Sequence, residues 1–220
     1  MDGKVASLES IPVGQVHIEG MLELPANTQS IVLFAHGSGS SRHSKRNNYV
    51  AGVLQNSGIG TLLMDLLTPE EDANYPTRFD IPLLTHRLLA ATGWIKNDPR
   101  IGHLRIGYFG ASTGAAAALQ AAAASAEEIG AVVSRGGRPD MAGINALEIV
   151  KSPTLLLVGG WDDEVITLNR DAYEHLHCTK ELKIIPGATH LFSEPGTLEE
   201  VARQAAAWFA KYLKPSRMEK

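Results

Sequence analysis

The chain has 220 residues, of which 44 % are hydrophobic and 20 % are charged. This composition is typical of a globular protein, and the length predicts a single domain over residues 1–220. The formal net charge of -4 excludes the broad basic surface that nucleic-acid binding requires. No apolar run reaches the roughly 18 residues of a membrane span. We therefore expect neither nucleic acid nor a membrane as a partner.

Cysteine usage and the first residues bear on the cellular compartment. The only cysteine, Cys178, cannot form an intrachain disulfide. Residues 1–10 lack the long apolar segment of a signal peptide. Both observations predict a cytoplasmic protein.

The first regular element in chain order is residues 15–24, which alternate between polar and apolar side chains. This period indicates a half-buried strand, and we expect it at an antiparallel edge. Nearly continuous apolar blocks are typical of parallel strands covered on both faces. They occupy residues 30–35, 60–65, 104–109 and 154–158, with 131–134 and 182–185 as further candidates. Helical spacing follows in residues 46–57, 81–97, 113–128, 168–177 and 197–213.

The alternation of strands and helices predicts the fold class. It indicates an α/β protein with a doubly wound, mostly parallel sheet flanked by helices, joined by right-handed crossovers. Ligands of such sheets bind at the carboxyl ends of the strands. Reactive side chains are therefore expected directly after the apolar blocks.

The clearest candidate is Ser112, in the sequence Gly110-Ala-Ser-Thr-Gly114 between a predicted strand and a predicted helix. The pattern G-x-S-x-G forms a sharp turn that exposes a nucleophilic serine. Side chains at positions 110 and 114 would collide with neighbouring backbone. The amide of Thr113, at the start of the helix, could then stabilise an oxyanion. The competing interpretation is an ordinary strand-to-helix turn.

A nucleophilic serine needs a histidine base, and that histidine needs a carboxylate to orient it. Downstream, Asp162 follows the strand at 154–158, and His190 follows the strand at 182–185. The order serine, acid, histidine is the one found with this turn. Asp163 is the rival for the acid, and Asp162 could instead cap a helix. His190 could alternatively be a surface histidine.

A glycine-rich loop, His36-Gly-Ser38-Gly-Ser-Ser, follows the strand at 30–35. At this position a loop amide provides the second oxyanion donor, and Ser38 is our candidate. A phosphate-binding P-loop is the alternative, but its lysine-serine ending is missing.

These motifs, together with Gly160-Trp-Asp and Gly187-Ala-Thr-His, resemble the dienelactone hydrolase family of the α/β-hydrolases over about residues 16–213. The resemblance implies a compact α/β-hydrolase fold without a large cap domain, and no cofactor. Dienelactone hydrolases themselves use a cysteine nucleophile, whereas this chain has Ser112. That departure leaves the substrate open.

Several residues near the predicted site have less specific signals. Arg42 follows the glycine-rich loop and Arg135 lies at the end of a predicted strand, so both could bind an acidic substrate, although solvated loop charges are the alternative. Trp161 could line the pocket or simply pack. His175, His177 and Cys178 do not share one helix face, so we expect no metal site. The long, proline-containing segment at 66–79 could border the site.

The sequence thus predicts a serine hydrolase that cleaves an ester or lactone of a small-molecule substrate through an acyl-enzyme. A non-catalytic binding module with this fold is the alternative from another class. A small peptidase or thioesterase is the alternative among enzymes, although a peptidase would be expected to carry a cap or extra domain. No metal or organic cofactor is expected. The oligomeric state is left open, a homodimer included.

Overall fold

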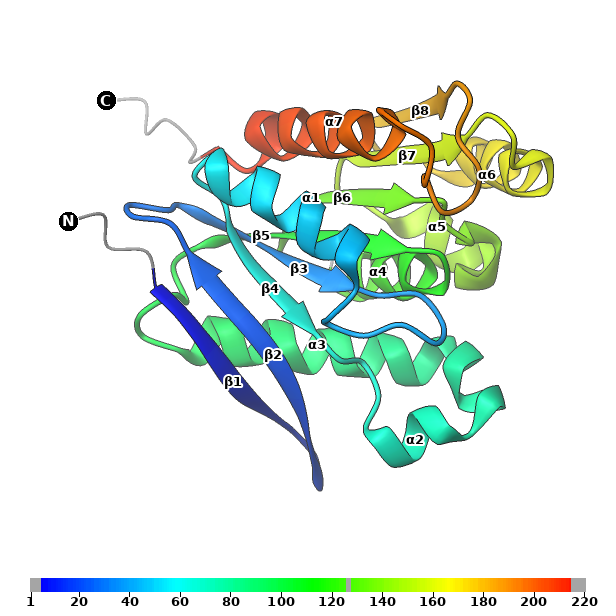
Figure 1. Cartoon of the computed structure of the whole chain (residues 1–220). Coiled ribbons are helices and arrows are strands. Elements are labelled where there is room, and N and C mark those ends of the chain that lie inside the picture. The colour runs from blue at the N-terminus through cyan, green and yellow to red at the C-terminus, as the bar shows by residue number, and fades with distance from the viewer. Residues whose placement is uncertain (1–4, 126–127, 215–220) are drawn as a thin grey trace.

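The structure is a computed structural model that describes residues 5–125 and 128–214. Within these residues one sheet has the strand order β1-β2-β4-β3-β5-β6-β7-β8 (Figure 1). Strands β3 to β8 run parallel, and β2 pairs antiparallel with both β1 and β4. The strands are β1 Val5–Val13, β2 Val16–Leu24, β3 Ser30–Ala35, β4 Gly60–Met64, β5 Arg105–Ala111, β6 Ile129–Arg135, β7 Thr154–Gly159 and β8 Lys180–Ile185. The predicted fold class is confirmed.

Helices cover both faces of this sheet (Figure 1). Helices α1 and α7 pack together on one face, whereas α3, α4 and α6 contribute to the core of the other. The helices are α1 Lys45–Asn56, α2 Pro69–Ala73, α3 Ile81–Asn97, α4 Thr113–Ala124, α5 Ile144–Ile149, α6 Asp163–His175 and α7 Thr197–Tyr212. Short 3-10 turns lie at Tyr75–Phe79 (η1) and Pro139–Ala142 (η2). None of the described helices is long and apolar enough to cross a membrane.

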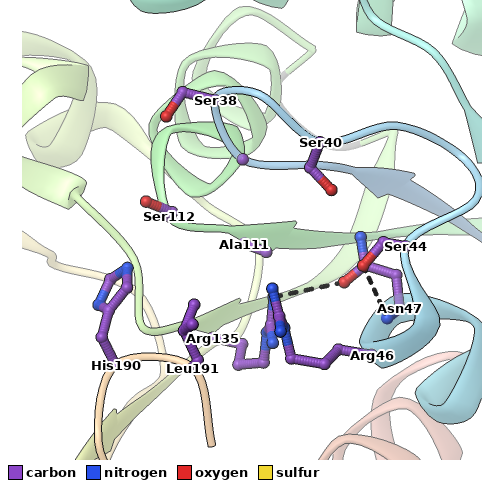
Figure 2. A pocket seen from close by; sticks show the side chains of 11 residues that line it. Ser38, Ser40, Ser44, Arg46, Asn47, Ala111, Ser112, Arg135, His190 and Leu191 are labelled. Carbon is purple, nitrogen blue, oxygen red and sulfur yellow. Dashed lines mark hydrogen bonds between the residues drawn. The ribbon is translucent and has the colours of Figure 1, made fainter.

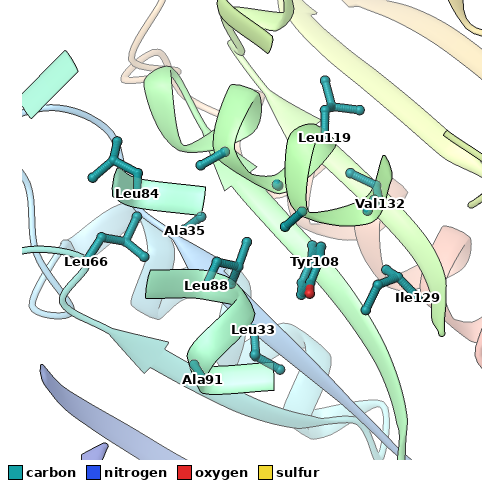
Figure 3. Packing of buried hydrophobic residues seen from close by; sticks show 14 of the residues in the cluster. Leu33, Ala35, Leu66, Leu84, Leu88, Ala91, Tyr108, Leu119, Ile129 and Val132 are labelled. Atoms are coloured by element: carbon teal, nitrogen blue, oxygen red, sulfur yellow. The ribbon is translucent and has the colours of Figure 1, made fainter. Parts of the chain in front are cut away.

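The apolar blocks divide between two cores because side chains alternate along a strand. In β3, Ile31 and Leu33 face α3 and α4, whereas Val32 and Phe34 face α1 and α7. Figure 3 shows Leu33 and Tyr108 of the sheet beside Leu88 of α3. The alanine-rich α4 is almost completely buried, because small side chains let a helix approach the sheet closely.

Some elements differ from the sequence-based expectations. Strand β1 lies outside β2, so β2 is not the edge strand. Helix α6 begins at Asp163, five residues earlier than expected. The segment at 66–79 contains α2 and η1. The helix predicted for 113–128 ends at Ala124, and residues 126–127 of that prediction lie outside the described residues.

Candidate active site

Ser112 lies at the sharp turn between β5 and α4. Its backbone has φ 51° and ψ -122°, a region that non-glycine residues rarely adopt. The turn is crowded on both sides. A Cβ on Gly110 would lie 2.4 Å from Ala115 Cα, and one on Gly114 would lie 2.2 Å from the Ala35 carbonyl oxygen. Only glycine fits at these two positions, as the sequence pattern indicated.

Asp162 and His190 meet at the carboxyl ends of β7 and β8. The Nδ1 of His190 donates to Oδ2 of Asp162 at 2.7 Å. Asp162 is the N-cap residue of α6, but its side chain makes no capping hydrogen bond, so the carboxylate is available to the imidazole. Asp163 is the first residue of the helix and is exposed. The structure therefore pairs His190 with Asp162 rather than with its rival.

The loop that carries His190 is held by its own hydrogen bonds. Glu194 accepts from the Thr189 hydroxyl at 2.7 Å and from the Thr189 amide at 3.0 Å. These hydrogen bonds hold the pKa of Glu194 below its usual range. Phe192 is buried with a positive φ of 53°. The side chain of His190 thus extends from a tight turn that these contacts hold in place.

One pocket of about 210 Å³ joins Ser112 and His190 (Figure 2). Its lining comes from the loop after β3, the first turn of α1, the ends of β5 and β6, and the loop after β8. The described residues that line it are Gly37, Ser38, Ser40, Ser44, Arg46, Asn47, Ala111, Ser112, Arg135, His190 and Leu191. No hydrogen bond joins the side chains of Ser112 and His190 within the described chain. Such contacts often tighten only when substrate is bound.

The glycine-rich loop after β3 passes directly over Ser112. A Cβ on Gly37 would lie 3.0 Å from Ser112 Cβ. Ser38 lines the same pocket as Ser112. Thr113 begins α4, where the first amides have no intrahelical acceptor. Ser38 and Thr113, the two predicted oxyanion residues, therefore lie on opposite sides of Ser112.

His36 anchors this loop. Its Nε2 accepts from the Leu66 amide at 3.0 Å, so Nδ1 carries the proton and donates to the Gly37 carbonyl at 2.9 Å. Burial lowers the pKa of His36, outweighing the opposing effects of the Gly37 hydrogen bond and Asp65. The neutral imidazole thus joins the loop after β3 to the end of β4.

The three predicted substrate-binding residues have different surroundings. Arg135 lines the pocket and is only 8 % exposed. Arg42 forms ion pairs with Glu19 and Asp65, so its guanidinium is engaged away from the pocket lining. Trp161 is 67 % exposed and is not among the described residues that line the pocket. The structure supports neither Arg42 nor Trp161 as part of this site.

The sequence interpretation missed the contribution of α1. Its first turn brings Arg46 and Asn47 to the pocket, beside Ser44. A helix was predicted to begin near Arg46, and helix starts are preferred sites for anions. That signal could have directed attention to Arg46 instead of Arg42. The segment at 66–79 borders the glycine-rich loop after β3, where Leu67, Asp72 and Arg78 lie beside Ser38 in a shallow crevice.

A mostly parallel eight-stranded sheet with flanking helices, and a serine at the turn after β5, define an α/β hydrolase. Residues 42–214 match the dienelactone hydrolase family. The chain belongs to that family.

Solved structures agree with this assignment. A dienelactone hydrolase from Anabaena variabilis is 55 % identical, with a TM-score of 0.93 over 96 % of this chain and 99 % of that one. Est1E from Butyrivibrio proteoclasticus shares 16 % identity with a TM-score of 0.80, over 93 % of this chain and 98 % of its own. The dienelactone hydrolase-like promiscuous phosphotriesterase P91, from metagenomic libraries, shares 17 % identity with a TM-score of 0.77, over 96 % of this chain and 99 % of its own. The last two likenesses show the fold alone.

Two curated Mycobacterium tuberculosis proteins are 54 % identical over 203 residues. Their names assign them provisionally as phosphoribosyl transferases. The match covers 92 % of this chain but only 46 % of each relative. The chain therefore spans about half the length of these proteins. Their names refer to the full-length proteins.

Proposed function

We propose that this protein is a carboxylic ester hydrolase that cleaves an ester or lactone with Ser112, His190 and Asp162 as its triad. One observation carries the proposal. The imidazole of His190 is held by Asp162 at 2.7 Å and lines the same pocket as Ser112. The Anabaena relative named as a dienelactone hydrolase supports an ester or lactone substrate.

In the proposed mechanism the Nε2 of His190 accepts the proton of the Ser112 hydroxyl as the serine oxygen attacks the substrate carbonyl. Asp162 fixes the tautomer, because it accepts the Nδ1 proton, and it stabilises the imidazolium that forms. The imidazolium then protonates the leaving alkoxide, which leaves an acyl group on Ser112. Attack by water, with His190 as base, releases the acid and restores the serine.

Oxyanion stabilisation falls to the amides of Ser38 and Thr113. The two residues flank Ser112 from the loop after β3 and from the start of α4. The loss of one such donor typically lowers the rate by about 100- to 1000-fold. Because these donors are backbone amides, side-chain substitutions at either position would leave the donor in place. His36 acts indirectly, by holding the Ser38 loop in position.

A fluorophosphonate probe tests this proposal, because it labels only an activated serine. The wild-type protein should be labelled at Ser112, and p-nitrophenyl acetate should be hydrolysed. Ser112→Ala should lose the label and lower kcat by on the order of a million-fold. Ser57→Ala, an exposed serine after α1, is the matched control and should behave like wild type. A wild-type protein that neither takes the label nor hydrolyses any ester would instead support the non-catalytic binding module.

A further inference from the structure

In the part of the chain that the structure describes, a buried cation in the pocket beside the proposed triad has no carboxylate partner. Arg135 is only 8 % exposed, and its Nε and Nη1 have no hydrogen-bond partner among the described residues. Its Nη2 lies 3.4 Å from Asn47 Oδ1, a weak contact. Phe192 lies 6.0 Å from the guanidinium and limits its position. Buried charges in proteins are normally paired, since desolvation costs several kcal/mol per ion.

A second guanidinium lies close by. Arg46 projects from the first turn of α1 toward Arg135 (Figure 2), and its buried Nε has no partner within the described chain. Burial lowers the pKa of Arg135 to about 10, and the nearby charge of Arg46 makes a smaller contribution in the same direction. Arg135 therefore remains charged at neutral pH, and the nearby charge of Arg46 repels it. None of the described residues that line the pocket carries a carboxylate.

The start of α1 adds further donors at the same place. Ser44 caps the helix by accepting from the Asn47 amide at 3.3 Å, and the first turn contains no acidic residue. The other early amides of the helix have no intrahelical acceptor, and the helix dipole places partial positive charge there. The hydroxyls of Ser40 and Ser44 line the same part of the pocket.

We propose that Arg46, Arg135 and the first turn of α1 form a subsite for the phosphate group of a phosphorylated ester or lactone. The inference rests on the proposed function, since it places the phosphate on the substrate that Ser112 attacks. Two guanidiniums and a helix start match the charge of a phosphate dianion. Residues from β6, the first turn of α1 and the loop after β3 line this pocket together, and the oxygens of a tetrahedral phosphate can accept hydrogen bonds from several directions. A planar carboxylate would need only one guanidinium fork.

The first experiment measures competition at pH 8 and constant ionic strength. Inorganic phosphate should raise the KM for p-nitrophenyl acetate and leave kcat unchanged, at concentrations at least ten-fold below those at which acetate has the same effect. Equal inhibition by phosphate and acetate, or none by phosphate, would overturn the subsite.

The second experiment compares 1-acetylglycerol 3-phosphate with 1-acetylglycerol, a pair that differs only in the phosphate. The wild-type kcat/KM should be at least ten-fold higher for the phosphorylated ester, and this ratio should fall toward one in Arg135→Met. Arg46 is only partly buried, so Arg46→Gln provides the same test in a variant that does not disturb the core. Arg138→Gln removes a nearby charge that pairs with Asp140 and should keep the wild-type ratio. A ratio near one in the wild type would refute the inference.

Calorimetry separates this inference from the proposed function. Ser112→Ala should bind inorganic phosphate as the wild type does, and Arg46→Gln should bind it at least ten-fold more weakly. If the wild-type protein bound phosphate but hydrolysed no ester, the proposed ester hydrolase function would be wrong and the phosphate subsite would stand. If it hydrolysed esters but did not bind phosphate, the subsite would be wrong and the ester hydrolase function would stand.

Discussion

Two adjacent aspartates after β7 have different surroundings. Asp162 is mostly buried, with 16 % of its side chain exposed, and contacts His190. Asp163 is exposed at the first position of α6. Because the two side chains point to different environments, only one can orient the imidazole.

This contrast gives a matched pair of variants. Asp162→Asn should lower kcat by about 10⁴-fold, because an amide stabilises the wrong tautomer of His190. Asp163→Asn makes the same chemical change on the neighbouring residue and should keep wild-type kcat. Steady-state hydrolysis of p-nitrophenyl acetate measures both. A large loss in Asp163→Asn with little loss in Asp162→Asn would reverse the assignment of the acid.

At the scale of elements, the apolar blocks and the glycine pattern were sufficient to predict the sheet and the turn at Ser112. Strand β1 was not predicted because polar Ser7 and Glu9, and Pro12, interrupt its apolar pattern. An edge strand tolerates them, since one side of its backbone is unpaired. The short helices α2 and α5 contain too few residues for helical periodicity to be recognised. The predicted helix start near Arg46 could have favoured Arg46 over Arg42, but it did not show that the first turn of α1 reaches the pocket.

Two glycine substitutions test how closely α4 approaches the sheet. Gly114→Ala should destabilise the protein by about 1–3 kcal/mol, because its Cβ would overlap the Ala35 carbonyl oxygen. Gly93→Ala, within α3, has nothing within 4 Å of the added Cβ. It should raise the free energy of unfolding by about 0.5–1 kcal/mol, since alanine favours helix. Urea unfolding monitored by circular dichroism measures both. Equal effects at the two positions would contradict the close approach.

For the whole molecule, the arrangement of strands explains how distant residues reach one pocket. Ser112, Asp162 and His190 follow β5, β7 and β8, which all point to the same edge of the sheet. The sequence could predict this edge because parallel strands end together. It could not predict which loop residues fill the space between the strand ends, since loop conformations depend on contacts such as the His36 link to β4.

His36 also makes the stability of the fold depend on pH. Its lowered pKa means that the folded protein disfavours the protonated imidazole. At pH values above the pKa of about 6.5 that histidine has in the unfolded chain, His36 does not reduce the stability of the fold. As the pH falls below that value, the unfolded chain takes up a proton more readily than the folded protein, and folding stability is progressively lost. This contributes up to about 1.4 kcal/mol per pH unit to the slope of unfolding free energy.

His36→Gln should flatten the dependence of unfolding free energy on pH between pH 7 and pH 5. The exposed His43→Gln should keep the wild-type slope. Urea titrations at several pH values provide the measurement. If both variants showed the wild-type slope, the buried histidine would not be the source of the pH dependence.

The unpaired guanidinium of Arg135 has a consequence for protein engineering. A residue that costs folding free energy but supplies ligand contacts is the kind that natural selection keeps and a stability screen discards. Random libraries of this protein selected only for heat resistance should therefore accumulate apolar replacements at position 135. Libraries selected for turnover of the natural substrate should retain arginine there.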